Sequence, residues 1–143
     1  MIVKVINKSN NPLPKYATEG SAGLDVHAFL KEPVIIKPLE RKIIPTGLFL
    51  EIPNGYEIQV RARSGMSIKH GITLINGVGT IDSDYRGEPG IPVVNLSNEE
   101  YEIKSGDKVA QIILAKYEHL EFKLEESLEE TDRSDGGFGH TGY

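Results

Sequence analysis

The residue types best suited to chemistry are concentrated in one short stretch, residues 76–88, which reads NGVGTIDSDYRGE. It combines glycines, carboxylates, an aromatic residue and an arginine, which is more charge than an ordinary core strand carries. Asn76 and Gly77 favour a tight turn, because both tolerate positive φ, and the apolar positions that flank this turn are Ile72, Leu74, Val78 and Ile81. The pattern predicts a β-hairpin whose turn presents backbone groups and the Asn76 amide, which together can read a flat polar ring edge.

Two carboxylates, Asp82 and Asp84, follow the turn and suit either a metal site or a general base. A calcium loop of the EF-hand type needs oxygen ligands at positions 1, 3, 5 and 12. Counted from Asp82, position 5 is Arg86 and position 12 is Val93, so the EF-hand reading fails. The Asp-Ser-Asp spacing alone leaves a solvated acidic turn and a functional loop equally open.

The composition of the whole chain indicates a β-rich domain that could hold this stretch in place. Its 143 residues suit one domain with one core. The 15 glycines and 8 prolines exceed the usual share of about 12% for the pair. They are scattered between short β-branched runs, which favours an all-β sandwich or barrel.

Charge and residue usage exclude several classes of function. The net charge of −5 argues against a general nucleic-acid-binding surface, which needs a basic face. The chain has no cysteine, so a disulfide framework, a thiol nucleophile and a thiolate metal site are all excluded. No stretch approaches about 18 apolar residues, and the N-terminus lacks a signal-peptide pattern. We therefore expect no nucleic-acid partner, no membrane partner and a cytoplasmic location.

Short strands separated by turns are predicted over most of the chain. Residues 34–60 are expected to form a meander broken at Pro45 and Gly47, and residues 97–100 a second hairpin turn. Segment 63–71 departs from this pattern and predicts one or two helical turns. Ser64 would be the N-cap of this helix, and Gly71 would end it. The strand candidates are residues 2–6, 24–28, 34–36, 43–52, 56–60, 91–96, 101–103 and 109–114.

Five segments together resemble the signature motifs of the homotrimeric dUTPases, in the order of that family. They are AGLDVHA at 22–28, RSGMSIKHG at 63–71, GVGTIDSDYRGE at 77–88, VAQII at 109–113 and RSDGGFGHTG at 133–142. The resemblance implies hydrolysis of dUTP to dUMP and pyrophosphate, by attack of water on the α-phosphorus. It also implies Mg²⁺ held mainly by the triphosphate. Such an enzyme would limit uracil incorporation into DNA and supply dUMP for dTMP synthesis.

The resemblance also implies roles for single residues. Asp82 would be the general base, which suits a carboxylate that is ionised at neutral pH. Tyr85 would pack under the deoxyribose and exclude a 2′-hydroxyl, and Asp25 would support the site. From spacing alone, Asp25 and Gln111 could equally be structural residues that satisfy buried polar groups. The remaining substrate-binding residues implied are Arg63, Ser64, Gly65, Asn76, Gly79, Thr80, Ile81, Gln111, Arg133, Phe138 and Gly139.

The fold implied by the resemblance is all-β: a distorted jelly-roll β-barrel with one short helix and a flexible C-terminal tail. Residues 1–130 would form the barrel domain, and residues 131–143 a mobile lid. Family members share each active site among three copies, so the resemblance implies a homotrimer. Two other functions stay open: a dCTP deaminase-like enzyme of the same fold, and a non-catalytic nucleotide-binding module.

Overall fold

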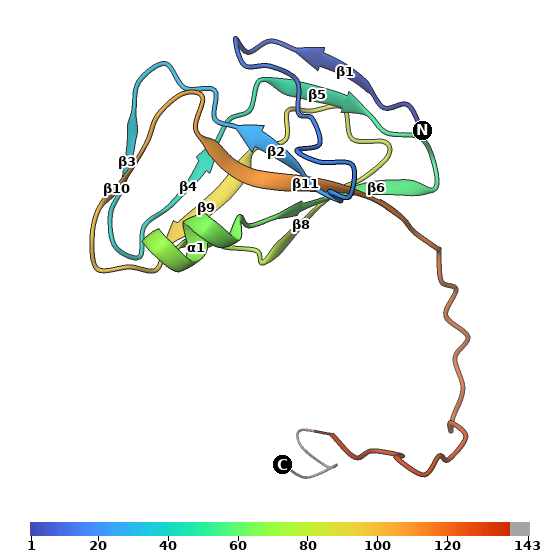
Figure 1. The fold of residues 1–143 in the computed structure, drawn as a ribbon. Coiled ribbons are helices and arrows are strands. Elements are labelled where there is room, and N and C mark those ends of the chain that lie inside the picture. The colour runs from blue at the N-terminus through green and yellow to red at the C-terminus, as the bar shows by residue number, and fades with distance from the viewer. Residues whose placement is uncertain (138–143) are drawn as a thin grey trace.

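The strands of the chain form an open jelly roll around one core (Figure 1). The structure is a computed structural model that describes residues 1–137. Within these residues the sheets do not close into one continuous hydrogen-bonded barrel, and the all-β prediction with one short helix is confirmed. The elements are β1 (Lys4–Asn7), β2 (Leu24–His27), β3 (Val34–Ile36), β4 (Arg41–Ile44), β5 (Leu48–Glu51), β6 (Tyr56–Arg61), α1 (Ser64–His70), β7 (Ile72–Leu74), β8 (Val78–Ile81), β9 (Ile91–Asn95), β10 (Tyr101–Ile103) and β11 (Lys108–Lys116).

Most strand pairs join segments that lie far apart in the chain. The largest sheet in the described residues has the order β2-β11-β6-β8, and a second has the order β4-β9-β7. Two further antiparallel pairs are β1 with β5 and β3 with β10. Such exchange of strands between sheets is what gives the jelly roll its long connections.

This topology corrects two predictions about neighbouring strands. Residues 34–60 do not form a meander, because β3, β4, β5 and β6 each pair with distant strands and not with one another. Residues 97–100 do not form a hairpin turn, because β9 pairs with β4 and β7 whereas β10 pairs with β3. Alternating apolar residues show which face of a strand is buried, but they do not show which strand lies beside it.

The core consists largely of β-branched side chains contributed by several sheets. Its largest fully buried members include Ile36, Ile44, Ile72, Ile91 and Ile103. Branched side chains pack well on a pleated surface, and each such burial contributes about 1.5–3 kcal/mol. The same core supports β6 and β8, the strands that lead to the candidate site.

Helix α1 is a seven-residue connector between β6 and β7. It ends as predicted at Gly71, which takes the left-handed conformation with φ 67°. The predicted N-cap is wrong, because Ser64 is the first helical residue and Arg63 takes the cap position without a side-chain cap hydrogen bond. The Arg63 side chain is instead engaged elsewhere. No helix of the described residues is long and apolar enough to cross a membrane.

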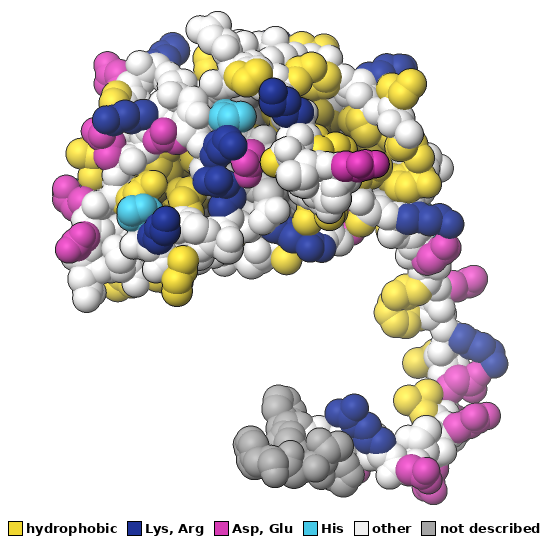
Figure 2. All heavy atoms as spheres, viewed as in Figure 1, with side chains coloured by type: hydrophobic (Ala, Val, Ile, Leu, Met, Phe, Trp, Pro, Cys, Tyr) yellow, Lys and Arg dark blue, Asp and Glu magenta, His cyan; other side chains and the backbone are white. Residues whose placement is uncertain are grey.

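After β11 the chain leaves the body as an extended tail (Figure 1). The N–H of Tyr117 donates to the carbonyl of Gly55 at 3.1 Å, which continues the β11–β6 ladder by one residue. Residues 118–135 are all exposed. Figure 2 shows hydrophobic and acidic side chains along this part of the tail, away from the rest of the chain.

Candidate active site

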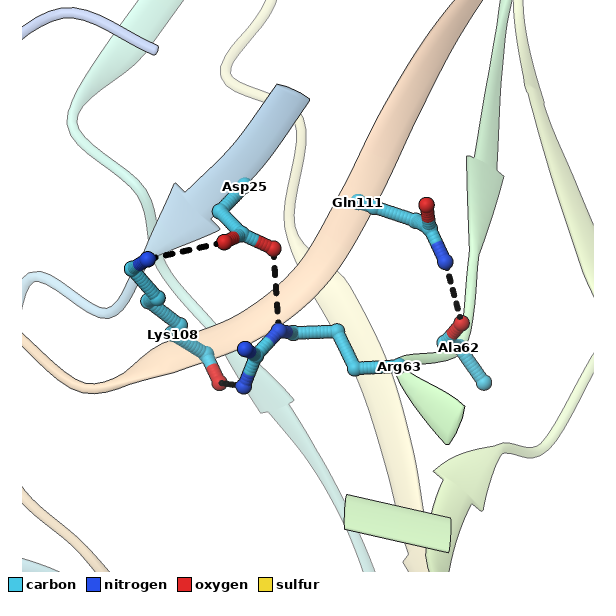
Figure 3. Close-up of polar contacts among 5 residues, drawn as sticks. All are labelled: Asp25, Ala62, Arg63, Lys108 and Gln111. Carbon is cyan, nitrogen blue, oxygen red and sulfur yellow. Dashed lines mark hydrogen bonds and ion pairs between the residues drawn. The ribbon is translucent and has the colours of Figure 1, made fainter. Parts of the chain in front are cut away.

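Asp25, Arg63 and Lys108 form an ion cluster at one end of the largest sheet (Figure 3). The Nε of Arg63 donates to Oδ1 of Asp25 at 2.9 Å, and the Nζ of Lys108 lies 2.9 Å from Oδ2. A second guanidinium nitrogen of Arg63 donates to the Lys108 carbonyl at 3.2 Å. Because the three residues come from β2, the start of α1 and β11, the fold brings distant segments together here.

The charges of the ion cluster keep Asp25 ionised. Partial burial raises the pKa of this carboxyl, but the hydrogen bond from Lys108 and the charge of Arg63 outweigh burial and hold the pKa below its ordinary value. Two cations on one carboxylate leave one positive charge in excess. An arginine and a lysine in such a setting can bind a phosphate by charge-assisted hydrogen bonds. Asp25 thus holds Arg63 and Lys108 next to each other, which is a structural role.

Ser64 and Gly65 continue the chain directly after the ion cluster. Both are exposed at the start of α1, and a Cβ added at Gly65 would meet no atom within 4 Å. The structure therefore places these two predicted residues beside Arg63, on open surface that a ligand could reach.

Gln111 lies on β11 next to the ion cluster (Figure 3). Its Nε2 donates to the carbonyl of Ala62 at 3.0 Å, which fastens the backbone directly before Arg63. A Cβ on Gly23 would come within 2.5 Å of the Gln111 Oε1, so the absence of a side chain at Gly23 leaves space for this amide. The amide thus has a structural partner in the chain, as one of the two readings of its sequence position expected.

Lys108 was not predicted as a site residue, although the structure places it in the ion cluster. The β11–β2 register shifts between Lys108 and Ala110, which marks a β-bulge. A bulge re-aims a side chain relative to its strand. The sequence carries no clear local signal for this bulge, so the place of Lys108 in the ion cluster follows only from the folded chain.

A second group of predicted residues surrounds an open cavity of about 250 Å³ beside β8. Strand β8 and the segments on either side of it supply most of the lining, and Val60 and Pro92 supply apolar surface. We call this space the β8 cavity. The predicted site residues that line it are Asn76, Gly79, Thr80, Ile81, Asp82 and Tyr85.

The turn at the rim of the β8 cavity is confirmed, but the hairpin is not. Gly77 has φ 71°, and its N–H donates to the Leu74 carbonyl at 3.2 Å. Strand β7 then pairs with β9, whereas β8 pairs with β6. The turn is therefore a corner between two sheets, because each flanking strand finds its partner on a different side.

Glu88, to which the sequence analysis assigned no role, anchors the loop after β8. Its Oε1 accepts hydrogen bonds from the backbone N–H groups of Thr46 at 2.9 Å and Gly47 at 2.7 Å. The hydroxyl of Tyr85 donates to the Glu88 carbonyl at 3.2 Å, and a Cβ on Gly87 would collide with that hydroxyl. The Tyr85 ring is thus held by its own loop, which the rest of the fold holds in turn.

The ion cluster and Asp82 lie at opposite ends of one strand pair. The β6–β8 register places Ile58 opposite Ile81, so Asp82 lies beside the start of β6 whereas Arg63 follows its end. The six residue steps from Glu57 to Arg63 span about 20 Å in an extended chain. Aspartate and arginine side chains do not bridge this distance. One chain therefore does not bring Asp82 and Arg63 onto the same phosphorus atom.

Arg133, the predicted tail residue that lies within the described part of the chain, joins neither group. The Nε of Arg133 donates to the Gly136 carbonyl at 2.8 Å, which is a contact within the tail. Phe138 and Gly139 lie outside the described residues. Three separate groups of predicted residues therefore exist in one chain: the ion cluster with its neighbours, the β8 cavity and the tail.

Known proteins resemble this chain along nearly its whole length. The sequence model of the dUTPase family matches residues 9–142. A deoxyuridine 5′-triphosphate nucleotidohydrolase from Finegoldia magna is 68% identical over 143 residues and is covered fully, as is this chain. One from Fusobacterium nucleatum is 57% identical over 140 residues, which cover 98% of this chain and 96% of the relative.

Solved structures share the fold. A mutant dUTPase of Staphylococcus bacteriophage 80alpha with bound dUpNHpp has a TM-score of 0.88 and 26% identity, with 99% of each chain covered. A mutant dUTPase from phage phi11 of S. aureus, described as coordinating a structural Mg(II) ion, has a TM-score of 0.81 and 25% identity. The match covers 91% of this chain and 100% of the phage protein.

Proposed function

Because the chain belongs to the dUTPase family, we propose that its β8 cavity binds the deoxyuridine part of dUTP and that its ion cluster binds the phosphates. The enzyme hydrolyses dUTP to dUMP and pyrophosphate. The observation that carries the assignment of the site is the gathering of six predicted residues around the one β8 cavity. In the cell, this activity would limit uracil incorporation into DNA and supply dUMP for dTMP synthesis.

Recognition of uracil is assigned to Asn76 and the backbone of β8. A Cβ on Gly79 would lie 3.2 Å from the Val60 Cβ and 3.3 Å from the Asn76 Nδ2, so a side chain there would crowd the Asn76 amide. A site built to hydrogen-bond a base rejects a base that lacks the matching hydrogen-bond pattern. Close packing would also leave no space for the 5-methyl group of thymine. Thr80 and Ile81 complete this strand, and Tyr85 packs under the sugar.

Asp82 is assigned as the general base. It is exposed and belongs to the lining of the β8 cavity, so a water molecule can reach its carboxylate. The carboxylate takes a proton from the water that attacks the α-phosphorus, and pyrophosphate leaves with the bonding electrons. Negative charge that develops on the phosphates is met by donors and cations, for which the candidates are Arg63, Ser64, Gly65, Gln111, Lys108 and Arg133.

Mg²⁺ is proposed as the cofactor, held by the substrate phosphates and water. When bound, the ion would neutralise phosphate charge and make the α-phosphorus easier to attack. Residues 1–137 contain no group of three or more His, Asp or Glu side chains that could hold a metal ion by themselves. Asp25, ionised in the ion cluster, could order water around it.

We further propose a homotrimer that shares its active sites. The separation of about 20 Å between the two ends of the β6–β8 pair supports this arrangement, because Asp82 of one copy and Arg63 of another could then face one substrate. The tail of a third copy would close the site with Arg133, Phe138 and Gly139. The division into a barrel domain of residues 1–130 and a lid of residues 131–143 stays a prediction, as does the cytoplasmic location.

The first part of the tail has a surface that suits contact with another copy. Leu120, Phe122 and Leu124 alternate with charged residues, and their exposed fractions are 72%, 90% and 98%. Such alternation is the pattern of a half-buried strand, yet this segment pairs with no strand of its own chain in the described residues. An exposed apolar face of this kind marks an interaction site.

Strand β1 offers a matching edge. In residues 1–137 it pairs only with β5, so its other edge is free to accept a strand. A groove of about 340 Å³ beside it is lined by the cations Lys4, Lys8 and Arg86 and by apolar surface from Phe49. Glu51 also lines it and pairs with Lys4 at 2.7 Å, so Lys8 and Arg86 are the cations left to meet an acidic segment. The tail is rich in glutamate, so the charges are complementary. We therefore assign residues 118–125 of one copy to the β1 edge of another.

The experiment that tests the proposed function is pyrophosphate release from a panel of dUTP, dTTP, dCTP and UTP, with and without Mg²⁺. We expect rapid release only from dUTP with Mg²⁺ present. Ammonia release from dCTP would point to the deaminase, and nucleotide binding without turnover to the binding module. Light scattering of the same sample should give three times the 15.8 kDa mass of one chain. The monomer mass at working concentration would contradict the shared sites.

A further inference from the structure

Tyr117, the last half-buried residue before the exposed part of the tail, connects the body to the loop that carries Asp82. Its hydroxyl donates to Oδ1 of Asn54 at 3.2 Å and accepts the N–H of Gly55 at 3.4 Å. The same hydroxyl lies 3.4 Å from Oγ of Ser83, and Ser83 is the donor here because the one proton of the phenol is given to Asn54. One phenol therefore joins the turn before β6 to the residue that follows Asp82.

Ser83 is thus held from two sides. Its side chain meets Tyr117, and its carbonyl accepts a hydrogen bond from a guanidinium nitrogen of Arg86 at 2.7 Å. The carboxylate of Asp82, by contrast, has no hydrogen bond or ion pair with any part of residues 1–137. Its direction is therefore set by the backbone on which it stands, and the nearest side chain that fixes this backbone from outside the loop is Tyr117.

Asp82 and Tyr117 also share a cavity. Besides the β8 cavity, Asp82 lines an open space of about 530 Å³ to which Glu57, Ser83 and Tyr117 contribute. Asp82 stands on the border of the two spaces. A carboxylate in this place, without partners of its own, can turn toward either one.

We propose that Tyr117 is a positioning residue for the hydrolysis, whose hydroxyl holds Ser83 and so directs the Asp82 carboxylate toward the attacking water. The inference rests on the proposed role of Asp82 as the base. Tyr117 is not among the residues that line the β8 cavity, where the nucleoside is proposed to bind. A base is effective only within hydrogen-bond reach of the proton that it removes, and misplacement by about 1 Å can cost up to about 100-fold in rate. The Tyr117 hydroxyl can limit such misplacement, because it holds the residue next to Asp82.

The test begins with Tyr117→Phe, which removes the hydroxyl and keeps the ring. We expect kcat to fall about fivefold with KM changed less than twofold, because the loss of one hydrogen bond has about this size and the residue does not bind substrate. Tyr56→Phe is the matched control. Tyr56 pairs with Lys116 on the neighbouring strand, and its hydroxyl has no hydrogen bond with another described residue. Its kcat should be unchanged.

Ser83→Ala provides a second route to the same contact, should Tyr117→Phe fold poorly. It breaks the contact with Tyr117 and leaves the bonds of the Tyr117 hydroxyl to Asn54 and Gly55 in place. It should lower kcat by a similar factor if the Ser83 contact is the one that matters, and the double variant should then lose no more than Tyr117→Phe alone. Multiplied losses in the double variant would overturn the inference. A wild-type kcat for Tyr117→Phe in a folded protein would overturn it as well.

The deciding measurement places Tyr117→Phe in an Asp82→Asn background. If Tyr117 acts through Asp82, it should cause no further loss there, whereas a general structural role would cost the same fivefold again. The fivefold loss of kcat caused by Tyr117→Phe should also be seen in a chain that lacks residues 131–143. Its disappearance there would assign Tyr117 to the tail alone and overturn the inference. Full activity of Asp82→Asn by itself is a different result, because it removes the proposed base while leaving the Tyr117 contact in place.

Discussion

Two arginines assigned to the substrate phosphates, Arg63 and Arg133, are held in opposite ways. Arg63 donates to the Asp25 carboxylate and to the Lys108 carbonyl, so its guanidinium is fixed by residues from two other segments. Within residues 1–137, the side chain of Arg133 bonds only to Gly136, three residues away in the tail. One arginine is positioned before substrate arrives, whereas the other must be brought to it.

This difference suggests a division of work between the body and the tail. Arg63 can bind phosphate with little loss of conformational entropy, because its side chain is already fixed. Docking of the tail fixes its backbone, at a cost of about 1–2 kcal/mol per residue. A segment that is ordered only by contact with substrate can also release product readily. We therefore expect the body to select the nucleotide and the tail to complete the site for reaction.

The largest expected effect lies in the body, at Asp82. Asp82→Asn keeps the shape of the side chain but cannot take a proton, so kcat should fall by about 100-fold or more with nucleotide binding retained. Asp84→Asn is a matched control, because it makes the same change in an exposed residue of the same loop. Steady-state pyrophosphate release gives kcat, and titration with a non-hydrolysable dUTP analogue gives binding. Turnover near the wild-type rate would remove Asp82 from the mechanism.

The next effect separates the tail from the body. Removal of residues 131–143 should lower activity by about tenfold or more, because Arg133 and Phe138 are lost, while Tm changes by less than about 2 °C. Little change in Tm is expected because the described tail residues add nothing to the buried core. Calorimetry measures the change in Tm, and pyrophosphate release from the same preparation measures the loss of activity. A large fall in Tm would show that the tail is part of the fold, and full activity would remove the tail from the active site.

Mixing two defective chains extends this comparison to the trimer. A truncated chain still has Asp82, and an Asp82→Asn chain still has its tail. If one copy supplies the base and another the tail, mixed trimers should regain part of the activity that both parents lack. Equal inactivity of the mixture, after subunit exchange is shown by mass, would mean that both parts of each site come from one chain.

The sequence was informative where local chemistry decides the structure. The turn at Gly77, the helix end at Gly71 and the alternating burial along β6 all follow from residue type and spacing. The pairing of strands was not predictable in the same way, because jelly-roll neighbours are distant in sequence and alternation does not name the partner strand. Hence the expected meander and both expected hairpins were wrong.

The same distinction between local chemistry and long-range contacts applies to the site residues. The motifs identified Asp25, Arg63 and Gln111, but not the contacts that join them. Lys108 and Glu88 were missed because their roles depend on a bulge and on a loop from a distant segment, and neither feature has a local signature. Residue type predicts chemistry, whereas only the packed chain shows which group holds another in place.

A smaller effect should appear at the sugar, where the body selects the substrate. Tyr85→Ala opens space beside the 2′ position, so the activity on UTP relative to dUTP should rise about fivefold. Tyr85→Phe is the control, because it keeps the ring and loses only the hydroxyl that bonds to the Glu88 carbonyl. The ratio of kcat/KM for the two nucleotides is the measurement. An unchanged ratio in Tyr85→Ala would exclude ring packing as the basis of selection.

The smallest effect concerns the stability of the ion cluster. The pKa of Asp25 is lowered in the folded chain, so its ionised form contributes stability that is fully present above the unfolded pKa, near 3.8, and is lost as the pH falls through the lower folded value. The ion pairs are partly exposed, so the contribution should not exceed about 1 kcal/mol.

Unfolding by denaturant between pH 7 and pH 2.5 should therefore show that wild type is more stable than Asp25→Asn at neutral pH. This difference should shrink below about pH 4 as the wild-type carboxylate takes up its proton. Asp84→Asn makes the same change at a residue that has no ion pair within residues 1–137, so it serves as the control for the substitution itself. Parallel pH profiles for wild type and Asp25→Asn would mean that Arg63 is not held by the charge of Asp25, and the contrast with Arg133 would then rest on the Lys108 carbonyl alone.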